Sequence, residues 1–117
     1  YPADDNWGKV PVWGCANVVE SKCADIPVGD RLWGFFPMAN STVLRPGKVT
    51  DKNFIDDTDH RKELPALYNA YSRTKAEPEV LQTMENERCL LFPLFATSYV
   101  LYDYLLDNNF VFVPLVI

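Results

Sequence analysis

The segment from residue 64 to 73 holds the side chains that are best suited to chemistry, because Tyr68, Asn69 and Tyr71 form a compact polar and aromatic group. A tyrosine phenol can donate a proton to a developing enolate, and an amide can hold a carbonyl oxygen by hydrogen bonding. These residue types make Tyr68 and Tyr71 candidate catalytic residues and Asn69 a candidate substrate ligand. The alternative is that the tyrosines pack their rings inward and leave their hydroxyls in water.

A second candidate feature is an apolar segment after a Gly29-Asp30 turn. Its large side chains would form a wall for a flat or hydrophobic substrate such as a quinone or an enone, and they are Trp33, Phe35, Phe36 and Met38. Large apolar side chains are also the ordinary content of a protein core. The sequence leaves both interpretations open for this segment.

The acidic run before the single histidine is the next candidate, since Asp56, Asp57, Asp59 and His60 lie close together in the chain. A short acidic run usually points into water, and Asp59 is suited to capping a turn or helix. A metal site needs converging ligands, and the sequence also holds no nucleophile motif of the G-x-S-x-G kind with which His60 could act as a base. We therefore expect no metal at this run.

The cysteines give no sign of a zinc site either. Cys15, Cys23 and Cys89 are odd in number and have no C-x-x-C spacing. Three small, partly buried thiols are the simplest interpretation. A bridge between Cys15 and Cys23 stays open for an oxidising compartment.

Composition narrows the class of protein. The chain has 117 residues, 48% of them hydrophobic, and a net charge of −5, which suits one globular domain and disfavours a nucleic-acid partner. The longest apolar runs, 89–100 and 110–117, are shorter than the roughly 20 residues of a membrane-spanning helix, so we expect no membrane partner. We expect a cytoplasmic protein; use of the Asn40-Ser41-Thr42 glycosylation sequon would make it secreted or lumenal.

The elements that must position these side chains follow an order of strands first and helices second. The pattern predicts strand structure over 10–19 with a break at Gly14, strands over 31–36 and 41–45, and a surface loop over 50–62. It then predicts helices over 64–73, 79–88 and 92–106, with Pro93 in the first turn of the last one and a stop at 107–109. A β run is expected from Phe110 to Val113. The fold class is α+β, one domain with a β-rich part at 1–60 and a helical part at 61–117.

Four segments in a fixed order resemble one protein family. They are Val10 to Gly14, Gly29 to Ala39, His60 to Tyr71, and Pro93 to Tyr99. This pattern resembles the GroES-like catalytic domain of medium-chain dehydrogenases/reductases, and within that superfamily a branch that is carried as a domain of unknown function. The resemblance covers roughly residues 7–110. It implies a partly open β-barrel followed by helices, the last of which leads to a β-strand.

The same resemblance implies an activity and several roles. The chain would belong with the zinc-free members, because it lacks the cysteine and histidine ligands of the zinc-dependent ones. The cofactor that the resemblance implies is NADPH. Thr97 would lie beside the nicotinamide, while Tyr99 and the group around Tyr68 would line the substrate side of the cleft. A histidine that the family places after Met-Ala is replaced here by Asn40 or Ser41.

One part of the family's pattern is missing, because no glycine follows Gly47. A dinucleotide needs a glycine-rich turn before a helix to hold its pyrophosphate. We therefore expect the chain to lack the nucleotide-binding domain, either as a fragment or as a natural remnant.

Three hypotheses about function follow. The first is the substrate-side domain of an NADPH-dependent oxidoreductase that acts on an apolar carbonyl, enone or quinone-like molecule. The second is a cofactor-free binding protein, cyclase or isomerase, for instance in secondary metabolism. The third is an inactive fragment with no ligand. An exposed apolar segment Phe110–Ile117 favours this third hypothesis, and the alternative is a homo-oligomer or a companion domain that buries the segment.

Overall fold

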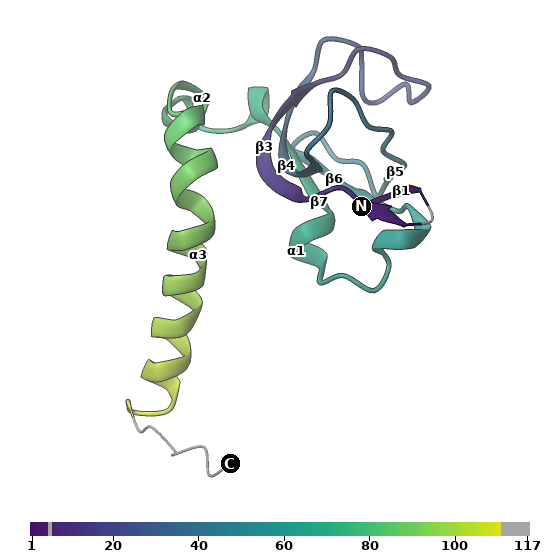
Figure 1. The fold of residues 1–117 in the computed structure, drawn as a ribbon. Coiled ribbons are helices and arrows are strands. Elements are labelled where there is room, and N and C mark those ends of the chain that lie inside the picture. Colours follow the sequence, from purple (N-terminus) through teal and green to yellow (C-terminus); the bar gives the residue numbers. More distant parts are fainter. Residues whose placement is uncertain (5, 111–117) are drawn as a thin grey trace.

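A computed structural model describes residues 1–4 and 6–110, and its centre is a five-stranded antiparallel sheet in the order β3-β4-β7-β6-β5 (Figure 1). The strands of this sheet are β3 (Pro11–Asn17), β4 (Arg31–Pro37), β5 (Pro46–Gly47), β6 (Asn53–Asp56) and β7 (Ala70–Arg73). A separate two-stranded sheet pairs β1 (Pro2–Asp4) with β2 (Trp7–Gly8). The predicted α+β class is confirmed. The predicted strand over 110–113 lies largely outside the described residues.

The strands predicted over 10–19 and 31–36 are present as β3 and β4, and the structure pairs them as a regular hairpin. They pair over seven positions from Pro11 opposite Pro37 to Asn17 opposite Arg31. The predicted break at Gly14 is wrong, because Gly14 pairs with Gly34 and both flanks of each strand continue the ladder. The connecting loop turns at Gly29, whose φ of 92° is a conformation that glycine adopts without a steric penalty.

The hydrophobic core lies on one face of the sheet. Its buried side chains are Ile26, Leu32, Phe36, Phe54 and Tyr71. Gly34 makes room for the Tyr71 ring, since a Cβ at residue 34 would lie 2.4 Å from Cδ1 of Tyr71. The core therefore depends on a glycine in the middle of β4.

Three sequence predictions about the middle of the chain are wrong. Residues 41–45 form no strand, and the predicted loop over 50–62 contains β6, where Phe54 is almost fully buried. The predicted helix over 64–73 is reduced to α1 (Ala66–Asn69), and β7 takes its second half. The reason is tertiary: β7 fills the position between β4 and β6, so its backbone groups find partners on both sides.

The C-terminal part is helical, with different boundaries from those predicted. Short 3-10 turns lie at Asp59–Arg61 and Thr74–Ala76, and the predicted helix over 79–88 is divided at Met84 into α2 (Glu79–Thr83) and the start of α3 (Glu85–Asp107). Pro93 consequently lies inside α3 instead of in a first turn, where it removes one backbone hydrogen bond. The predicted stop is confirmed, as Asn109 and Phe110 have φ values of 50° and 55°.

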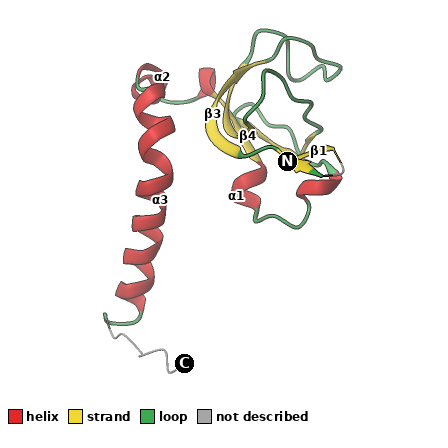
Figure 2. Cartoon of the chain, viewed as in Figure 1, coloured by secondary structure: helices red, strands yellow, loops and turns green. Residues whose placement is uncertain are grey.

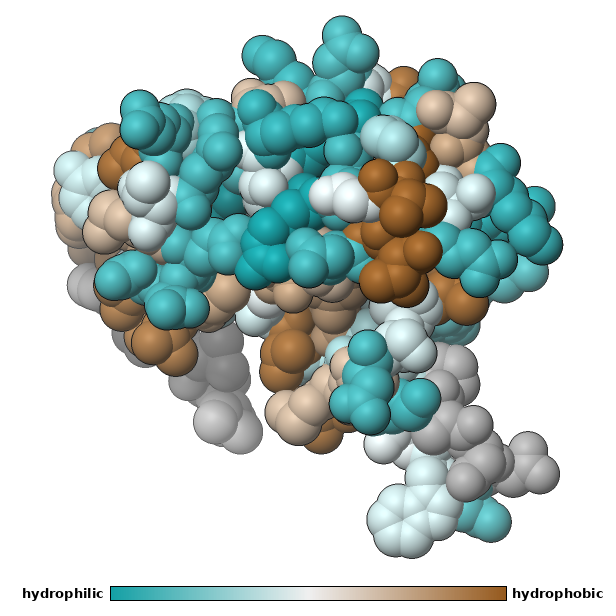
Figure 3. Space-filling model, turned by 90° about the horizontal axis from the view of Figure 1, so that it is seen from above, coloured by the Kyte–Doolittle hydropathy of each residue, from teal (hydrophilic) through white to brown (hydrophobic). Residues whose placement is uncertain are grey.

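The long helix α3 extends away from the rest of the molecule. Figure 2 shows it as a rod beside the curved layer of strands, which it meets near its beginning. Within the described chain it is one helix whose length and apolar composition would be enough to cross a membrane. The apolar run 89–100 is shorter than this helix, because α3 includes residues 85–88 before the run and residues 101–107 after it. Seen from above, hydrophobic side chains emerge around the end that carries α2 and α3, while much of that face is hydrophilic (Figure 3).

Candidate functional site

The residues of the predicted apolar wall that belong to β4 lie on opposite faces of this strand. Side chains alternate along a strand, so Leu32 and Phe36 enter the core while Trp33 and Phe35 lie on the other face. Met38 follows the strand and is 64% exposed. Of the four predicted wall residues, the structure therefore brings together Trp33 and Phe35.

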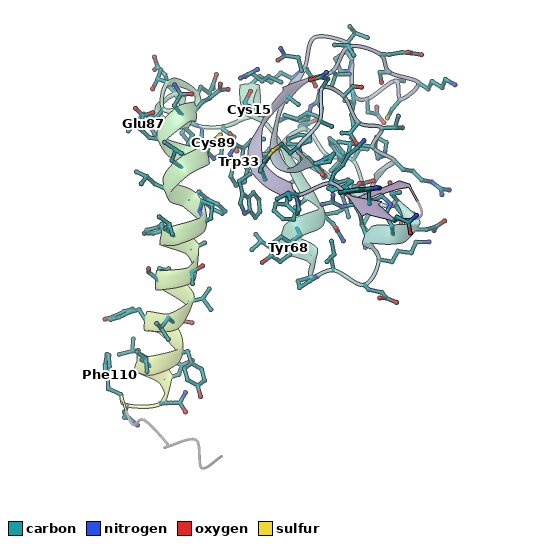
Figure 4. The ribbon with its side chains drawn as sticks, in the orientation of Figure 1. Cys15, Trp33, Tyr68, Glu87, Cys89 and Phe110 are labelled. Carbon is teal, nitrogen blue, oxygen red and sulfur yellow. The ribbon has the colours of Figure 1, made fainter. Side chains whose placement is uncertain are left out.

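Five rings meet on this second face of the sheet and form what we call the aromatic cluster, made of Trp13, Trp33, Phe35, Tyr68 and Phe92. Trp13 stacks on Trp33 with ring centres 4.9 Å apart, and the Phe92 ring meets the Trp33 ring edge-on at 4.6 Å. The Tyr68 ring completes the cluster at 5.0 Å from Phe35. Trp33 and Tyr68 both lie on the side of the sheet that faces α3 (Figure 4).

Two members of the aromatic cluster were not predicted as site residues. Trp13 is opposite Phe35 in the β3–β4 register, and the alternation of side chains along two paired strands would have placed both on one face. Phe92 comes from α3 and contacts both tryptophans. No local signal in the sequence shows that this helix returns to the sheet.

Charged groups border the aromatic cluster where α3 meets the sheet. The Arg88 guanidinium lies 3.9 Å from the centre of the Trp33 ring and forms an ion pair with Glu77 at 2.5 Å. Arg31 pairs with Glu85 at 2.5 Å, and its hydrogen bonds hold the pKa of Glu85 below the ordinary value. These contacts fix the first turns of α3 to the sheet.

The Cys15 thiol lies at the same border. Burial, and next the neighbouring Glu85 carboxylate, raise the pKa of Cys15 to about 12. The three cysteines are free in the structure. A thiol in this state stays protonated near neutral pH and is a poor nucleophile.

Tyr71 and Asn69 lie inside the protein and not at the aromatic cluster. Tyr71 is fully buried, its hydroxyl donates a hydrogen bond to the Phe35 carbonyl at 2.6 Å, and burial raises its pKa. The Asn69 amide accepts from Nε of Arg61 at 3.0 Å and donates to the Arg61 carbonyl at 2.8 Å. Both side chains therefore hold the fold together in this structure. Of the predicted polar group, Tyr68 alone reaches the aromatic cluster.

Thr97, which the resemblance placed beside a nicotinamide, and Tyr99, which it placed on the substrate side of the cleft, both lie on the free part of α3. The Thr97 hydroxyl donates to the Pro93 carbonyl at 2.8 Å, within its own helix. Tyr99 is 60% exposed, and its ring stacks on Phe95. Neither of them contacts the aromatic cluster.

A surface pocket adjoins the aromatic cluster at Phe35. It has a volume of about 330 Å³ and is lined by Tyr1, Pro11, Phe35, His60, Arg61 and Leu64. His60 lies edge-on to the Tyr1 ring at 5.3 Å, so the single imidazole of the chain borders this pocket. The pocket and the aromatic cluster together form the candidate site: an apolar, aromatic surface with a phenol and an imidazole at its borders.

The described residues do not fit a dinucleotide on their own. The one helix of more than five residues among them, α3, has Glu85 and Glu87 in its first turn and no preceding glycine-rich turn. Carboxylates at that position repel a pyrophosphate, which needs free backbone N–H groups there.

The described residues also hold no group of three or more His, Cys, Asp or Glu side chains that could bind a metal ion. The acidic run is dispersed: Asp56 is buried against Thr58 and Arg61, while Asp59 pairs with Lys62. The carboxylates of Asp56 and Asp59 thus already interact with other side chains of the protein.

Comparison with known proteins gives one match. The model of a family described as "Protein of unknown function (DUF2855)" matches residues 1–117. No curated protein and no solved structure matches the chain.

Proposed function

Since the chain belongs to the DUF2855 family of proteins of unknown function, we propose a function from the candidate site: it is the substrate-side part of a zinc-free, NADPH-dependent oxidoreductase-like protein. The substrate would be an apolar carbonyl, enone or quinone-like molecule. The reductase element of this proposal is supported by the four ordered segments that resemble the GroES-like domain of medium-chain dehydrogenases/reductases. The substrate element is supported by the geometry of the candidate site.

The observation that carries the proposal is the junction of the aromatic cluster with the pocket at Phe35. The pocket volume of about 330 Å³ is at the lower end of the range for small-molecule sites, which are mostly apolar with a few polar groups. A pocket of this size would hold a small, flat ring system. In this arrangement Phe35 offers an aromatic surface, with the half-buried Tyr68 ring 5.0 Å away. The Tyr68 phenol would donate a hydrogen bond to a substrate carbonyl, which is a role that the buried Tyr71 cannot take.

The cofactor would be held outside the described residues, because their one long helix has an acidic first turn. When bound, NADPH would supply the hydride. The residues of this chain would bind and orient the acceptor, and exclude water from it with their aromatic surface.

The same observations favour one other candidate function. A cofactor-free binding protein, or a cyclase or isomerase, would also need an aromatic surface and a few hydrogen-bonding groups. It would not need a pyrophosphate site. The two candidates therefore share the substrate site and differ in the need for a cofactor.

Binding of a quinone tests the shared part of the proposal. Menadione is titrated into the 117-residue chain, and tryptophan fluorescence is followed with inner-filter correction, because Trp13 and Trp33 lie in the aromatic cluster. We expect saturable quenching, a Kd about tenfold higher in Phe35→Leu, and no change in Val43→Ala, which alters a remote side chain that is 90% exposed. Quenching that does not saturate, or that Phe35→Leu leaves unchanged, would rule out this site.

Calorimetric titration with NADPH tests the cofactor's place. No heat of binding is expected from the chain alone, with or without menadione. Saturable NADPH binding would contradict the conclusion that the cofactor is held outside the described residues. Conversion of an enone probe without any nicotinamide would favour the cofactor-free alternative.

A further inference from the structure

The exposed surface of α3 is the largest feature that the candidate site does not use. We propose that the face of α3 turned away from the sheet binds the same face of α3 in a second copy of the chain, so that the protein forms a homodimer. This inference does not depend on the proposed function.

The exposed apolar area of α3 is too large for the surface of a monomer. Ten large side chains of the helix are between 50% and 73% exposed, namely Leu90, Leu91, Leu94, Phe95, Tyr99, Val100, Leu101, Tyr102, Tyr104 and Leu106. At roughly 120 Å² each they expose on the order of 1,200 Å², whereas the largest apolar patch of a typical monomer is about 300–600 Å². A specific interface buries at least about 600 Å² per partner, and six of these side chains lie on or beside the face away from Phe92 and expose about 700 Å² together, namely Leu90, Leu91, Leu94, Val100, Leu101 and Tyr104.

The spacing of side chains on the outer face predicts a helix as the partner. Leu90, Leu94, Thr97, Leu101 and Tyr104 follow each other at intervals of four, three, four and three residues, which is the spacing that packs one helix along another. We call these five residues the outer seam. At 3.6 residues per turn the outer seam lies opposite Phe92, the side chain that contacts the sheet.

The docking of α3 on the sheet argues against a lipid bilayer as the occupant. Arg88 and Phe92 are fixed against Trp33, so the free helix runs from Pro93 to Asp107. Its length of about 22 Å is less than the roughly 30 Å of a hydrocarbon core. Asp103 lies on the Phe92 side of the helix, so a helix on the outer seam leaves its carboxylate in water, whereas a bilayer would surround it.

A second copy meets these requirements because it supplies a helix of the same length with the same outer seam. Most soluble oligomers are symmetric, and a twofold dimer brings identical patches together. Thr97 is the smallest residue of the outer seam and lies at its centre. Two helices that cross at this point can approach closely, with leucines packing on both sides.

Light scattering after size exclusion tests the proposal at micromolar concentrations. We expect a mass of twice 13.4 kDa for the native chain. The double variant Leu94→Glu/Leu101→Glu should run as a monomer with an unchanged circular dichroism spectrum, since both side chains are exposed in the single copy. The matched control is Tyr99→Glu/Leu106→Glu, which adds the same two carboxylates on the Phe92 side and should remain dimeric.

Three results would overturn the proposal. The first is a monomeric native chain up to about 100 μM. The second is equal loss of association in both double variants. The third is co-sedimentation of the native chain and the outer-seam variant alike with phosphatidylcholine vesicles, which would make a bilayer the occupant.

Discussion

Arg61 and Asn69 bind each other twice inside the protein. Nε of Arg61 donates to Oδ1 of Asn69 at 3.0 Å, and Nδ2 of Asn69 donates to the Arg61 carbonyl at 2.8 Å. The guanidinium also donates to the carbonyls of Phe35 and Tyr68 and lies 3.5 Å from the Asp56 carboxylate. A buried cation is tolerated only when it is fully paired, so this network fixes the loop before α1 to the sheet.

Replacement of Asn69 by alanine should destabilise the protein by about 2–4 kcal/mol, because it leaves a donor of the buried Arg61 without a partner. The measurement is the free energy of unfolding from urea denaturation followed by circular dichroism. Glu63→Ala, which changes an exposed side chain of the same loop, should stay within about 0.5 kcal/mol of the native value. If the two variants were equally stable, the Arg61–Asn69 pair would have no structural role.

The paired glycines of the hairpin provide a second, internally controlled test. Gly34→Ala should cost about 2–3 kcal/mol, because its Cβ would lie 2.4 Å from the fully buried Tyr71 ring, which is packed against Phe36 and Phe54. Gly14→Ala, at the paired position, meets no atom within 4 Å and should change stability by less than about 0.5 kcal/mol. Thermal unfolding of both variants gives the comparison, and a similar loss in both would show that backbone flexibility, not the Tyr71 contact, is the cause.

The parts of the fold that the sequence predicts well are those with a strong local pattern. The strand over 31–36 alternates large side chains and ends at a proline, and the structure has β4 at Arg31–Pro37. The helix predicted over 64–73 is wrong in its second half, because the apolar residues recur at helical spacing while the sheet requires a strand at Tyr71. The strand β6 was missed because its core face holds the polar Asp56, whose Oδ1 accepts a hydrogen bond from Thr58 and whose Oδ2 lies 3.5 Å from the Arg61 guanidinium.

The candidate site was predictable in part for the same physical reason. The strand period of two separates Trp33 and Phe35 from Phe36, and this rule alone would have placed Phe36 in the core. The roles expected for Tyr71 and Asn69 could not be judged from the sequence, because their burial depends on Arg61 and Phe35, which are distant in the chain. The contact of Phe92 with the sheet is likewise long-range.

The stability of the protein should fall in acid because of Asp30. Its buried carboxylate contacts Arg73 at 2.6 Å and Lys75 at 2.5 Å. Burial alone would raise the pKa of Asp30, but the hydrogen bonds from Lys75 and Arg73 lower it below the ordinary value of 3.8. A carboxyl group with a lowered pKa in the folded state stabilises that state above its ordinary pKa, and this contribution is lost as the pH falls through the lowered value.

We therefore expect the free energy of unfolding of the native chain to decrease as the pH falls below about 4, and the decrease to be smaller in Asp30→Asn. At pH 7 the variant should already be less stable by about 2–4 kcal/mol, since Arg73 stays buried without its partner. Urea denaturation at a series of pH values measures both effects. Asp25→Asn, which alters an exposed carboxylate, serves as the control and should follow the native pH profile.

The reactivity of Cys15 reports whether α3 is docked on the sheet. Because burial and the Glu85 carboxylate raise the pKa of Cys15 to about 12, little thiolate is present at pH 8. Its alkylation by iodoacetamide should be at least about tenfold slower than in the urea-unfolded chain, even after allowing for the higher intrinsic reactivity of a more basic thiolate. Mass spectrometry of the peptide that contains Cys15 measures the rate.

Phe92→Ala, which removes the ring that joins α3 to Trp13 and Trp33, should speed this alkylation by exposing Cys15, whereas Leu94→Ala, on the outer seam, should not. Equal rates in the two variants would mean that the Phe92 contact does not protect Cys15.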